Sequence, residues 1–317
     1  MVQAVSDTGI GMTMLPVLYQ YSGFGASAPR DDQRRFINTP DALLHLVDAL
    51  RREYPERGDL RYGVAPHSLR AVSEASLNEL LAGLNADAPV HIHIAEQTAE
   101  VDACVQTEGA RPVQWLLDRF DVNARRCLVH ATHVDAVETA ALAQSSAVAG
   151  LCLTTEANLG DGIFPAREYL EANGAFGIGS DSHIGVDWRS ELRLLEYGQR
   201  LARRERNVLA GPHRAQVADR LFDAALHGGA RASGRVIGKL ETGARADMIV
   251  LDADHPNLAE QSADTWLSSV VFCEHGASSI LDVYAGGERV VERGRYRDKA
   301  QLYADYRAVL ARLLNDA

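Results

Sequence analysis

Short apolar runs alternate with longer amphipathic segments over most of the chain before residue 180. The apolar runs lie at residues 12–19, 62–65, 90–95, 126–131, 147–153 and 175–179. The segments between them predict helices over residues 40–54, 73–84, 113–120, 136–144 and 165–171. Strands of a parallel sheet are buried on both faces and are therefore apolar throughout, as these runs are. The alternation is typical of βα units around a parallel sheet.

The pattern changes after residue 232. Residues 238–246 are rich in turn formers, residues 247–253 and 270–274 predict strands, and residues 280–291 predict a hairpin across Gly286 and Gly287. Residues 297–314 predict a closing amphipathic helix. Because no helices are predicted between these strands, they are assigned to a small antiparallel or mixed sheet outside the main one. The chain is therefore divided into residues 1–232 and 233–317.

Polar side chains gather where the apolar runs end, namely His67, His93, Glu96, His130, Glu156, Asp181 and His183. In a β/α barrel the carboxyl ends of the strands and the loops after them form the active site. A doubly wound open sheet would also collect residues at strand ends. No glycine-rich phosphate loop follows an early strand, however, so the pattern favours the barrel.

The strongest chemical signal is the stretch His91-Ile-His93-Ile-Ala-Glu96. Alternation along a strand places His91 and His93 on one face, with His93 nearer the open end. A neutral imidazole at that position is a good zinc ligand, and Glu96 just beyond it can move protons between a water and a leaving group. The alternative is a pair of core histidines satisfied by hydrogen bonds.

Two later strand ends carry His130 and Asp181. His130 can bind a metal or stabilise a developing negative charge, whereas His133 falls in the following turn and is the weaker candidate. Asp181, in Gly-Ser-Asp, can ligate zinc and accept a proton from water. The alternatives are a structural histidine and an Asx-turn or N-cap aspartate.

The segment Ala65-Pro-His67-Ser-Leu-Arg70 places a cation beside an imidazole at another strand end. This pair suits an anionic substrate, because the arginine fork matches a carboxylate in a bidentate fashion. The alternative is an arginine paired with a surface acid.

The composition of the chain limits the classes of partner and the location that are expected for it. A net charge of −11 argues against nucleic acid or an anionic membrane. No apolar run approaches the roughly 20 residues needed to span a bilayer, and no basic segment followed by an apolar one marks a signal peptide. The cysteines are too few and too scattered for a disulfide framework, which favours a cytoplasmic location: Cys104, Cys127, Cys152 and Cys273.

Taken together, several segments resemble the amidohydrolase superfamily of metal-dependent hydrolases, and within it the deiminases of N-formimino-L-glutamate. They are Leu15-Pro-Val-Leu-Tyr19, Ala65-Pro-His-Ser-Leu-Arg70, His91-Ile-His-Ile-Ala-Glu-Gln97, Leu128-Val-His-Ala-Thr-His133, Thr154-Thr-Glu-Ala-Asn-Leu-Gly160 and Gly179-Ser-Asp-Ser-His183. The resemblance covers essentially the whole chain. It implies an α/β fold, a (β/α)8-type TIM barrel missing its first two strands, followed by part of a small β-sandwich and a closing helix.

Carried over by position, the resemblance implies that His93 and Asp181 ligate one zinc ion, that Glu96 shuttles protons, and that His130 supports the tetrahedral intermediate. His67 and Arg70 would hold the substrate's carboxylates. The implied reaction is hydrolysis of the C=N bond of N-formimino-L-glutamate to N-formyl-L-glutamate and ammonia, a step of histidine degradation. The resemblance also implies a homodimer.

The chain departs from the family in its metal site. The family places a His-x-His pair at the end of the first barrel strand, but the only such pair here lies on the later run at residues 90–95. The chain is therefore expected to begin inside the second barrel helix, at residues 1–11, and to lack two strands and two metal ligands. Little or no deiminase activity is expected of it alone.

Two other functions stay open. One is a second kind of aminohydrolase of the same superfamily, acting on a purine, pterin or triazine ring. The other is a non-catalytic remnant that serves as a structural or partner-binding domain, to which the missing ligands give weight.

Overall fold

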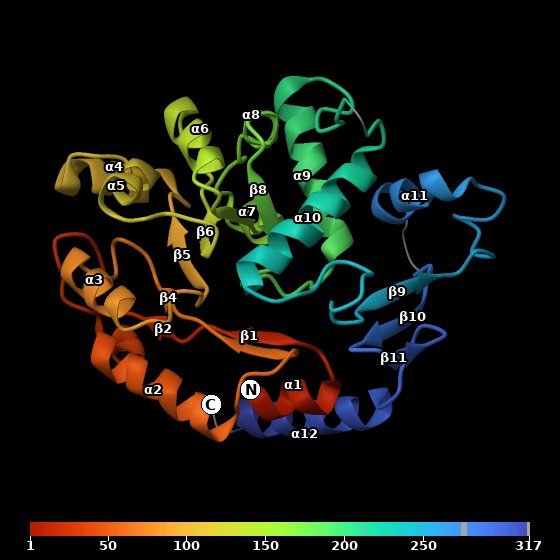
Figure 1. The fold of residues 1–317 in the computed structure, drawn as a ribbon, viewed down its shortest axis with the longest axis horizontal. Helices are drawn as coiled ribbons and strands as arrows, with labels where there is room; N and C mark the ends of the chain where they lie inside the picture. The colour runs from red at the N-terminus through yellow and green to blue at the C-terminus, as the bar shows by residue number, and fades with distance from the viewer. Residues whose placement is uncertain (213, 274–277, 316–317) are drawn as a thin grey trace.

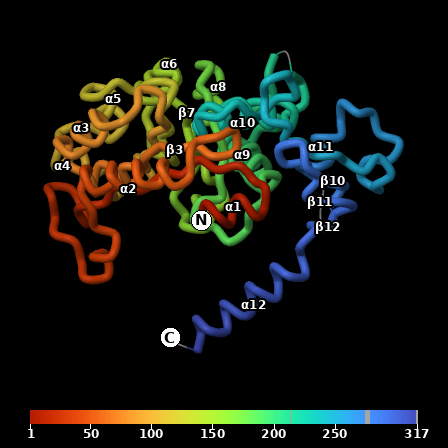
Figure 2. Tube along the Cα trace, turned by 60° about the horizontal axis from the view of Figure 1, so that its bottom comes forward, coloured from red at the N-terminus to blue at the C-terminus, as the bar shows by residue number. Residues whose placement is uncertain are grey.

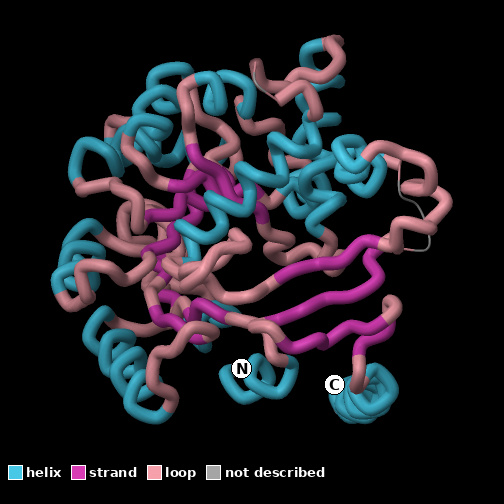
Figure 3. Tube along the Cα trace, turned by 45° about the vertical axis from the view of Figure 1, so that its right-hand side comes forward, coloured by secondary structure: helices cyan, strands magenta, loops and turns pink. Residues whose placement is uncertain are grey.

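The computed structural model describes residues 1–212, 214–273 and 278–315. Its centre is a set of parallel strands, which Figure 1 and Figure 3 show surrounded by helices. The strands are β1 (Met12–Met14), β2 (Val17–Leu18), β3 (Leu60–Tyr62), β4 (Ala65–Pro66), β5 (Val90–Ile94), β6 (Arg126–His130), β7 (Val148–Leu151) and β8 (Ala175–Ile178). All six predicted apolar runs contain strand, as expected of buried parallel strands.

The strands follow one another in chain order. β1 pairs with β3 and β2 with β4, while β5, β6, β7 and β8 form one sheet in that order, all parallel. Single parallel bridges from Val64 to Val90 and from Ser68 to His93 join β4 to β5. Because every strand runs the same way, all their carboxyl ends lie on one side of the molecule, where the predicted site residues follow them.

Helices connect and cover the strands. They are α1 (Val2–Thr8), α2 (Pro40–Glu53), α3 (Glu74–Ala82), α4 (Thr98–Glu108), α5 (Pro112–Arg119), α6 (Ala136–Gln144), α7 (Leu153–Leu159), α8 (Ala166–Glu171), α9 (Trp188–Arg203) and α10 (Val217–Ser233), with a 3-10 turn η1 (Asp31–Phe36). The five predicted helices are confirmed. α3 begins where Ser73 caps it by accepting from the Ser76 N–H. The sequence pattern had left α4, α7, α9 and α10 unassigned.

The contact between α10 and β8 is unusually close. A side chain at Gly228 would overlap the carbonyl of Phe176, so only glycine allows the helix to approach the strand this closely. The next residue, Gly229, has open space where a Cβ would lie. The end of α10 also reaches the central strands, because Thr13 Oγ1 donates to Ser233 O (2.7 Å).

The last part of the chain forms a separate antiparallel sheet in the order β12-β11-β10-β9. Its strands are β9 (Met248–Leu251), β10 (Ile280–Ala285), β11 (Glu288–Glu292) and β12 (Arg295–Tyr296). The predicted hairpin is confirmed, with Gly286 and Gly287 at φ 62° and 87°. The predicted closing helix is present as α12 (Lys299–Asn315), which Figure 2 shows running away from the rest of the chain.

The strand predicted over residues 270–274 is wrong. Val270 and Val271 are buried in α11 (Trp266–Phe272), which follows the 3-10 turn η2 (Ala263–Thr265), and Glu274 lies outside the described residues. A short β-branched run does not distinguish a strand from a buried helix. The expectation that no helix separates these strands is therefore also wrong, because α11 lies between β9 and β10. Over the described ranges, none of the helices has the length and apolar character needed to cross a membrane.

Candidate active site

The carboxyl ends of β5, β6 and β8 bring three predicted residues together, with Glu96 and Asp181 beside the ring of His130. The His130 side chain is buried, and its Nε2 lies 3.6 Å from Glu96 Oε1 and 3.8 Å from Asp181 Oδ2. Burial alone would lower the pKa of His130, but the hydrogen bond to Glu156 and the charges of Glu96 and Asp181 outweigh it and raise that pKa. The cluster can therefore accept, hold and return a proton at one nitrogen.

Two further imidazole rings, those of His93 and His67, lie in a row beside His130 at the neighbouring strand ends. The His130 and His93 ring centroids are 5.7 Å apart, those of His93 and His67 are 4.9 Å apart, and Tyr19 meets His67 edge-on at 4.7 Å. The structure thus places His67, His93 and His130 side by side, as expected from their positions at the ends of β4, β5 and β6.

His93 is held in a defined tautomer. Its Nδ1–H donates to the His67 carbonyl oxygen at 2.8 Å, because a carbonyl can only accept. Nε2 therefore carries the lone pair. A histidine is prepared to bind a metal when a carbonyl oxygen accepts from one ring nitrogen and the other nitrogen keeps its lone pair.

His67 is neutral. Burial lowers its pKa to about 3, and repulsion between a protonated His67 and its neighbours His93 and Arg70 acts in the same direction. Its Nδ1 lies 3.0 Å from Ser68 Oγ. A neutral ring can serve a carboxylate as a hydrogen-bond donor but not as a cation, so the positive charge at this strand end comes from Arg70.

Arg70 lines a small cavity of about 240 Å³ together with Trp115 and two acids, Glu74 and Glu108, and the residues around His130 do not line it. Among the residues that the structure describes, no carboxylate lies within ion-pair distance of its guanidinium. The alternative of an arginine paired with a surface acid is therefore not what is seen. Its charge does act on Glu100, opposing the burial that raises the pKa of that carboxyl group.

The backbone turns sharply where the strands end. Ala95, His130, Ala131 and Asp181 all have positive φ, between 49° and 68°. Non-glycine residues adopt this region infrequently, and such strain gathers at functional sites. The turns at His130 and Asp181 help to bring side chains from β6 and β8 into one cluster.

The other histidines noted in the sequence have structural contacts. His91 is held by the Ala232 carbonyl oxygen (2.8 Å) and His133 by that of Asp161 (2.7 Å), both through Nε2. His91 is thus a satisfied core histidine, the alternative considered for this pair. His183 is placed by its backbone, whose N–H donates to Thr155 Oγ1 (3.0 Å). None of the three touches the His130 cluster through these bonds.

Glu156 is the buried acid of the site to which the sequence assigned no role. It lies in the first turn of α7, directly after β7, and its Oε1 is 3.2 Å from His130 Nδ1. Its position at a strand end was the only signal available, since the contact joins residues 26 positions apart.

The chemistry of the donors fits zinc only in part. His93 offers an uncommitted nitrogen and Asp181 a carboxylate, both suitable zinc donors. Within the described part of the chain, however, no three His, Cys, Asp or Glu side chains are grouped so that they could hold a metal ion. Catalytic zinc takes three protein ligands and keeps an open position. The described residues therefore do not present the complete set of ligands that catalytic zinc takes.

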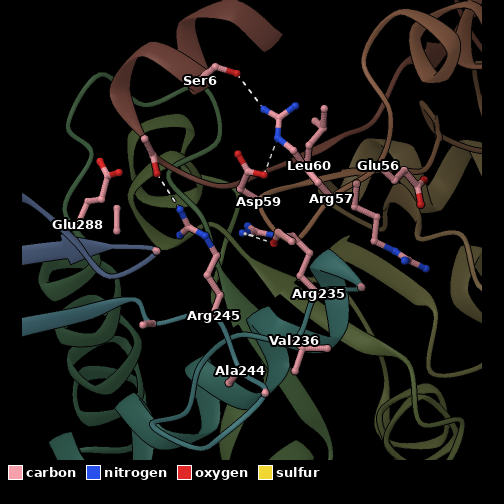
Figure 4. Close-up of a pocket in the computed structure, with 18 of the residues that line it drawn as sticks. Ser6, Glu56, Arg57, Asp59, Leu60, Arg235, Val236, Ala244, Arg245 and Glu288 are labelled. Carbon is pink, nitrogen blue, oxygen red and sulfur yellow. Dashed lines mark hydrogen bonds and ion pairs between the residues drawn. The ribbon is translucent and has the colours of Figure 1, made fainter.

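A larger cavity of about 900 Å³ lies elsewhere (Figure 4). Arg57, Asp59 and Leu60 line it just before or at the start of β3, and Arg235 and Arg245 line it from the segment after α10. It is thus at the amino end of the strands and contains none of the predicted site residues. Most of its arginines are in ion pairs, such as Arg57 with Asp59 (2.7 Å).

Comparison with known proteins gives the class of the chain. The sequence pattern of the amidohydrolase family matches residues 17–290, and the chain belongs to this family. Within the family it is a homologue of the formimidoylglutamate deiminase of Pseudomonas aeruginosa, to which it is 48% identical over 313 residues. The match covers 99% of this chain and 69% of that enzyme.

Further relatives are more distant. The chain is 30% identical over 244 residues to a 5-methylthioadenosine/S-adenosylhomocysteine deaminase of Natronomonas pharaonis, which covers 74% of this chain and 53% of that enzyme. The chain thus spans about half the length of this second relative.

Solved structures agree with the family assignment. An amidohydrolase from Brucella melitensis superposes with a TM-score of 0.92 at 44% identity, over 98% of this chain and 68% of that one. An adenosine deaminase from Xanthomonas campestris with bound zinc superposes with a TM-score of 0.80 at 22% identity, over 99% of this chain and 68% of that one. The second likeness shows the α/β amidohydrolase fold alone.

Proposed function

We propose that the strand-end residues form the substrate site of a formimidoylglutamate deiminase, which hydrolyses the C=N bond of N-formimino-L-glutamate. The observation that carries the proposal is the convergence of Glu96 and Asp181 on the Nε2 atom of His130, at 3.6 and 3.8 Å. The homology to the Pseudomonas aeruginosa enzyme supports the choice of substrate.

The proposed fold is a (β/α)8-type barrel to which this chain contributes six parallel segments, with residues 1–232 in the barrel and 233–317 in a β-sandwich portion with its closing helix. Two features support it. The segments follow one another in parallel order, and no strand pairing joins β8 back to β1 among the described residues. The chain also spans only about two thirds of the Brucella melitensis structure.

The proposed chemistry adds water to the formimino carbon and expels ammonia, leaving N-formyl-L-glutamate. Glu96 takes a proton from the attacking water and gives it to the imino nitrogen, and the second proton of the water passes through Asp181 to the same nitrogen, which leaves as ammonia. His130 lies between the two carboxylates. It supports the tetrahedral intermediate by a hydrogen bond to a substituent of the reacting carbon. Zinc, when bound by His93, Asp181 and further ligands, would lower the pKa of its bound water to near 7.

Substrate recognition is assigned to the end of β4. The Arg70 guanidinium, which has no carboxylate partner among the described residues, suits a substrate carboxylate. His67 would act as a neutral hydrogen-bond donor to the same group, since its pKa is lowered to about 3. A dicarboxylate such as formiminoglutamate uses both residues, whereas a purine nucleoside carries no carboxylate for them.

Replacing Arg70 tests this assignment. R70Q is expected to weaken binding of N-formimino-L-glutamate roughly 10- to 100-fold, because a hydrogen bond to a charged group contributes about 1.5–3 kcal/mol. Isothermal titration calorimetry of the 317-residue chain in the presence of zinc measures the dissociation constant without requiring turnover.

The matched control is R125Q. Arg125 is also partly buried, but it precedes β6 at the amino end of the strands and donates to the Ala88 carbonyl oxygen (3.4 Å). R125Q should bind the substrate as the wild type does. If R70Q also kept the wild-type dissociation constant, the assignment of Arg70 to a substrate carboxylate would be wrong.

A further inference from the structure

We propose that Glu156 is a positioning residue that keeps the proton of the His130 imidazole on Nδ1, so that Nε2 is the nitrogen presented to Glu96 and Asp181. The inference rests on the proposed function of that cluster. It concerns a residue to which neither the sequence signals nor the relatives assign a role.

Glu156 is deeply buried beside His130. The residue is 1% exposed, as is His130. A single carboxylate oxygen, Oε1, accepts from the Cys152 N–H at 2.9 Å and lies 3.2 Å from His130 Nδ1. The other oxygen, Oε2, is buried without a hydrogen-bond partner among the described residues. A carboxylate this deeply buried is costly unless its neighbours donate hydrogen bonds to it.

These contacts determine which ring nitrogen carries the proton. A carboxylate accepts hydrogen bonds, so the 3.2 Å contact stabilises His130 only when Nδ1 is protonated. The two acceptors on the opposite side, Glu96 and Asp181, lie farther from Nε2, at 3.6 and 3.8 Å. Without Glu156 these two carboxylates would be the only acids near the ring among the described residues, and the proton of the neutral ring would move to Nε2.

A purely structural role for Glu156 would be to hold the start of α7. Glu191 provides a matched control for that role. It is 2% exposed, and it accepts from Thr154 N (3.1 Å) and from Thr154 Oγ1 in the same turn of α7. Its described hydrogen bonds go to Thr154 and not to His130. Losing Glu191 should therefore disturb the start of α7 without changing the His130 tautomer.

The test is nitrogen NMR of the zinc-free 317-residue chain labelled with 15N-histidine, with the His130 signals assigned from H130Q. Because the pKa of His130 is raised, spectra are recorded at increasing pH, from the ordinary imidazole pKa of about 6.5 upward, and are compared once the ring is neutral and holds a single proton. Wild type and E156Q, whose amide oxygen can still accept, should show a protonated Nδ1. E156L should lose that proton from Nδ1 in most molecules, and E191L should not.

Several outcomes would overturn the proposal. These are an unprotonated Nδ1 in the wild type, an unchanged Nδ1 in folded E156L, or the same change in E191L as in E156L. Should E156L not fold, the wild-type spectrum decides, since a protonated Nδ1 supports the proposal and an unprotonated one refutes it. No substrate or zinc enters the measurement, so a failed deiminase assignment and a failed role for Glu156 are distinguishable.

Discussion

The purified 317-residue chain, supplied with zinc, is expected to release ammonia from N-formimino-L-glutamate at least about 100-fold more slowly than the Pseudomonas aeruginosa enzyme. Loss of even an outer-shell partner of a metal ligand costs roughly 10- to 100-fold. Here the shortfall is in the ligands themselves, because no three His, Cys, Asp or Glu side chains are grouped for a metal among residues 1–212, 214–273 and 278–315. His93 and Asp181 alone should hold zinc weakly.

Two measurements check this expectation. Steady-state ammonia release compares the two proteins at equal zinc, and elemental analysis after dialysis gives the zinc retained per chain. D181N, which removes one of the two proposed donors, should lower whatever zinc is retained. One tightly held zinc per chain, together with turnover close to that of the Pseudomonas aeruginosa enzyme, would contradict the conclusion that the chain has too few zinc ligands. The same result would rule out a non-catalytic remnant.

Replacing Gly228 by alanine is expected to destabilise the chain by about 1–3 kcal/mol, the usual cost of overpacking a tight contact. The added methyl group would overlap the carbonyl of Phe176, which is backbone in the middle of β8 and cannot rotate away. The overlap can be relieved only if α10 moves away from β8. The same contact supports the strand whose end leads to Asp181, so G228A should also weaken substrate binding.

Gly229 is the control for this prediction, because it is adjacent in the same helix and has nothing within 4 Å of its added Cβ. G229A should stabilise the chain by about 0.5–1 kcal/mol, since alanine favours a helix interior over glycine. Urea unfolding followed by circular dichroism measures both variants. Equal effects of the two substitutions would show that α10 does not pack on β8 as described.

The parallel strands could be predicted because they are short, apolar and separated by amphipathic helices. The same criterion misled at residues 270–274, where Val270 and Val271 are buried in α11 rather than in a strand. An apolar run of that length fits a buried helix equally well. Only its packing in three dimensions, which the sequence does not display, distinguishes the two.

The strand-end rule brought out Glu96, His130 and Asp181, which the structure groups around one imidazole nitrogen. It favoured His93 over His91 only by position along the strand, and the contact of His91 with the Ala232 carbonyl shows that His91 belongs to the core. The rule could not show that Glu156 meets His130 Nδ1, since that contact depends on how the first turn of α7 is oriented. The positive φ angles at Ala95 and Asp181 likewise could not be predicted, because neither position is a glycine.

The proposed function requires that the strand ends form a site for a small dicarboxylate amidine rather than for a nucleoside. The most direct test is calorimetric titration of the zinc-supplemented chain with N-formimino-L-glutamate and, separately, with 5-methylthioadenosine. We predict that the amidine binds at least about 10-fold more tightly, a difference of about 1.4 kcal/mol. Equal or tighter binding of the nucleoside, or no detectable binding of the amidine, would contradict the account.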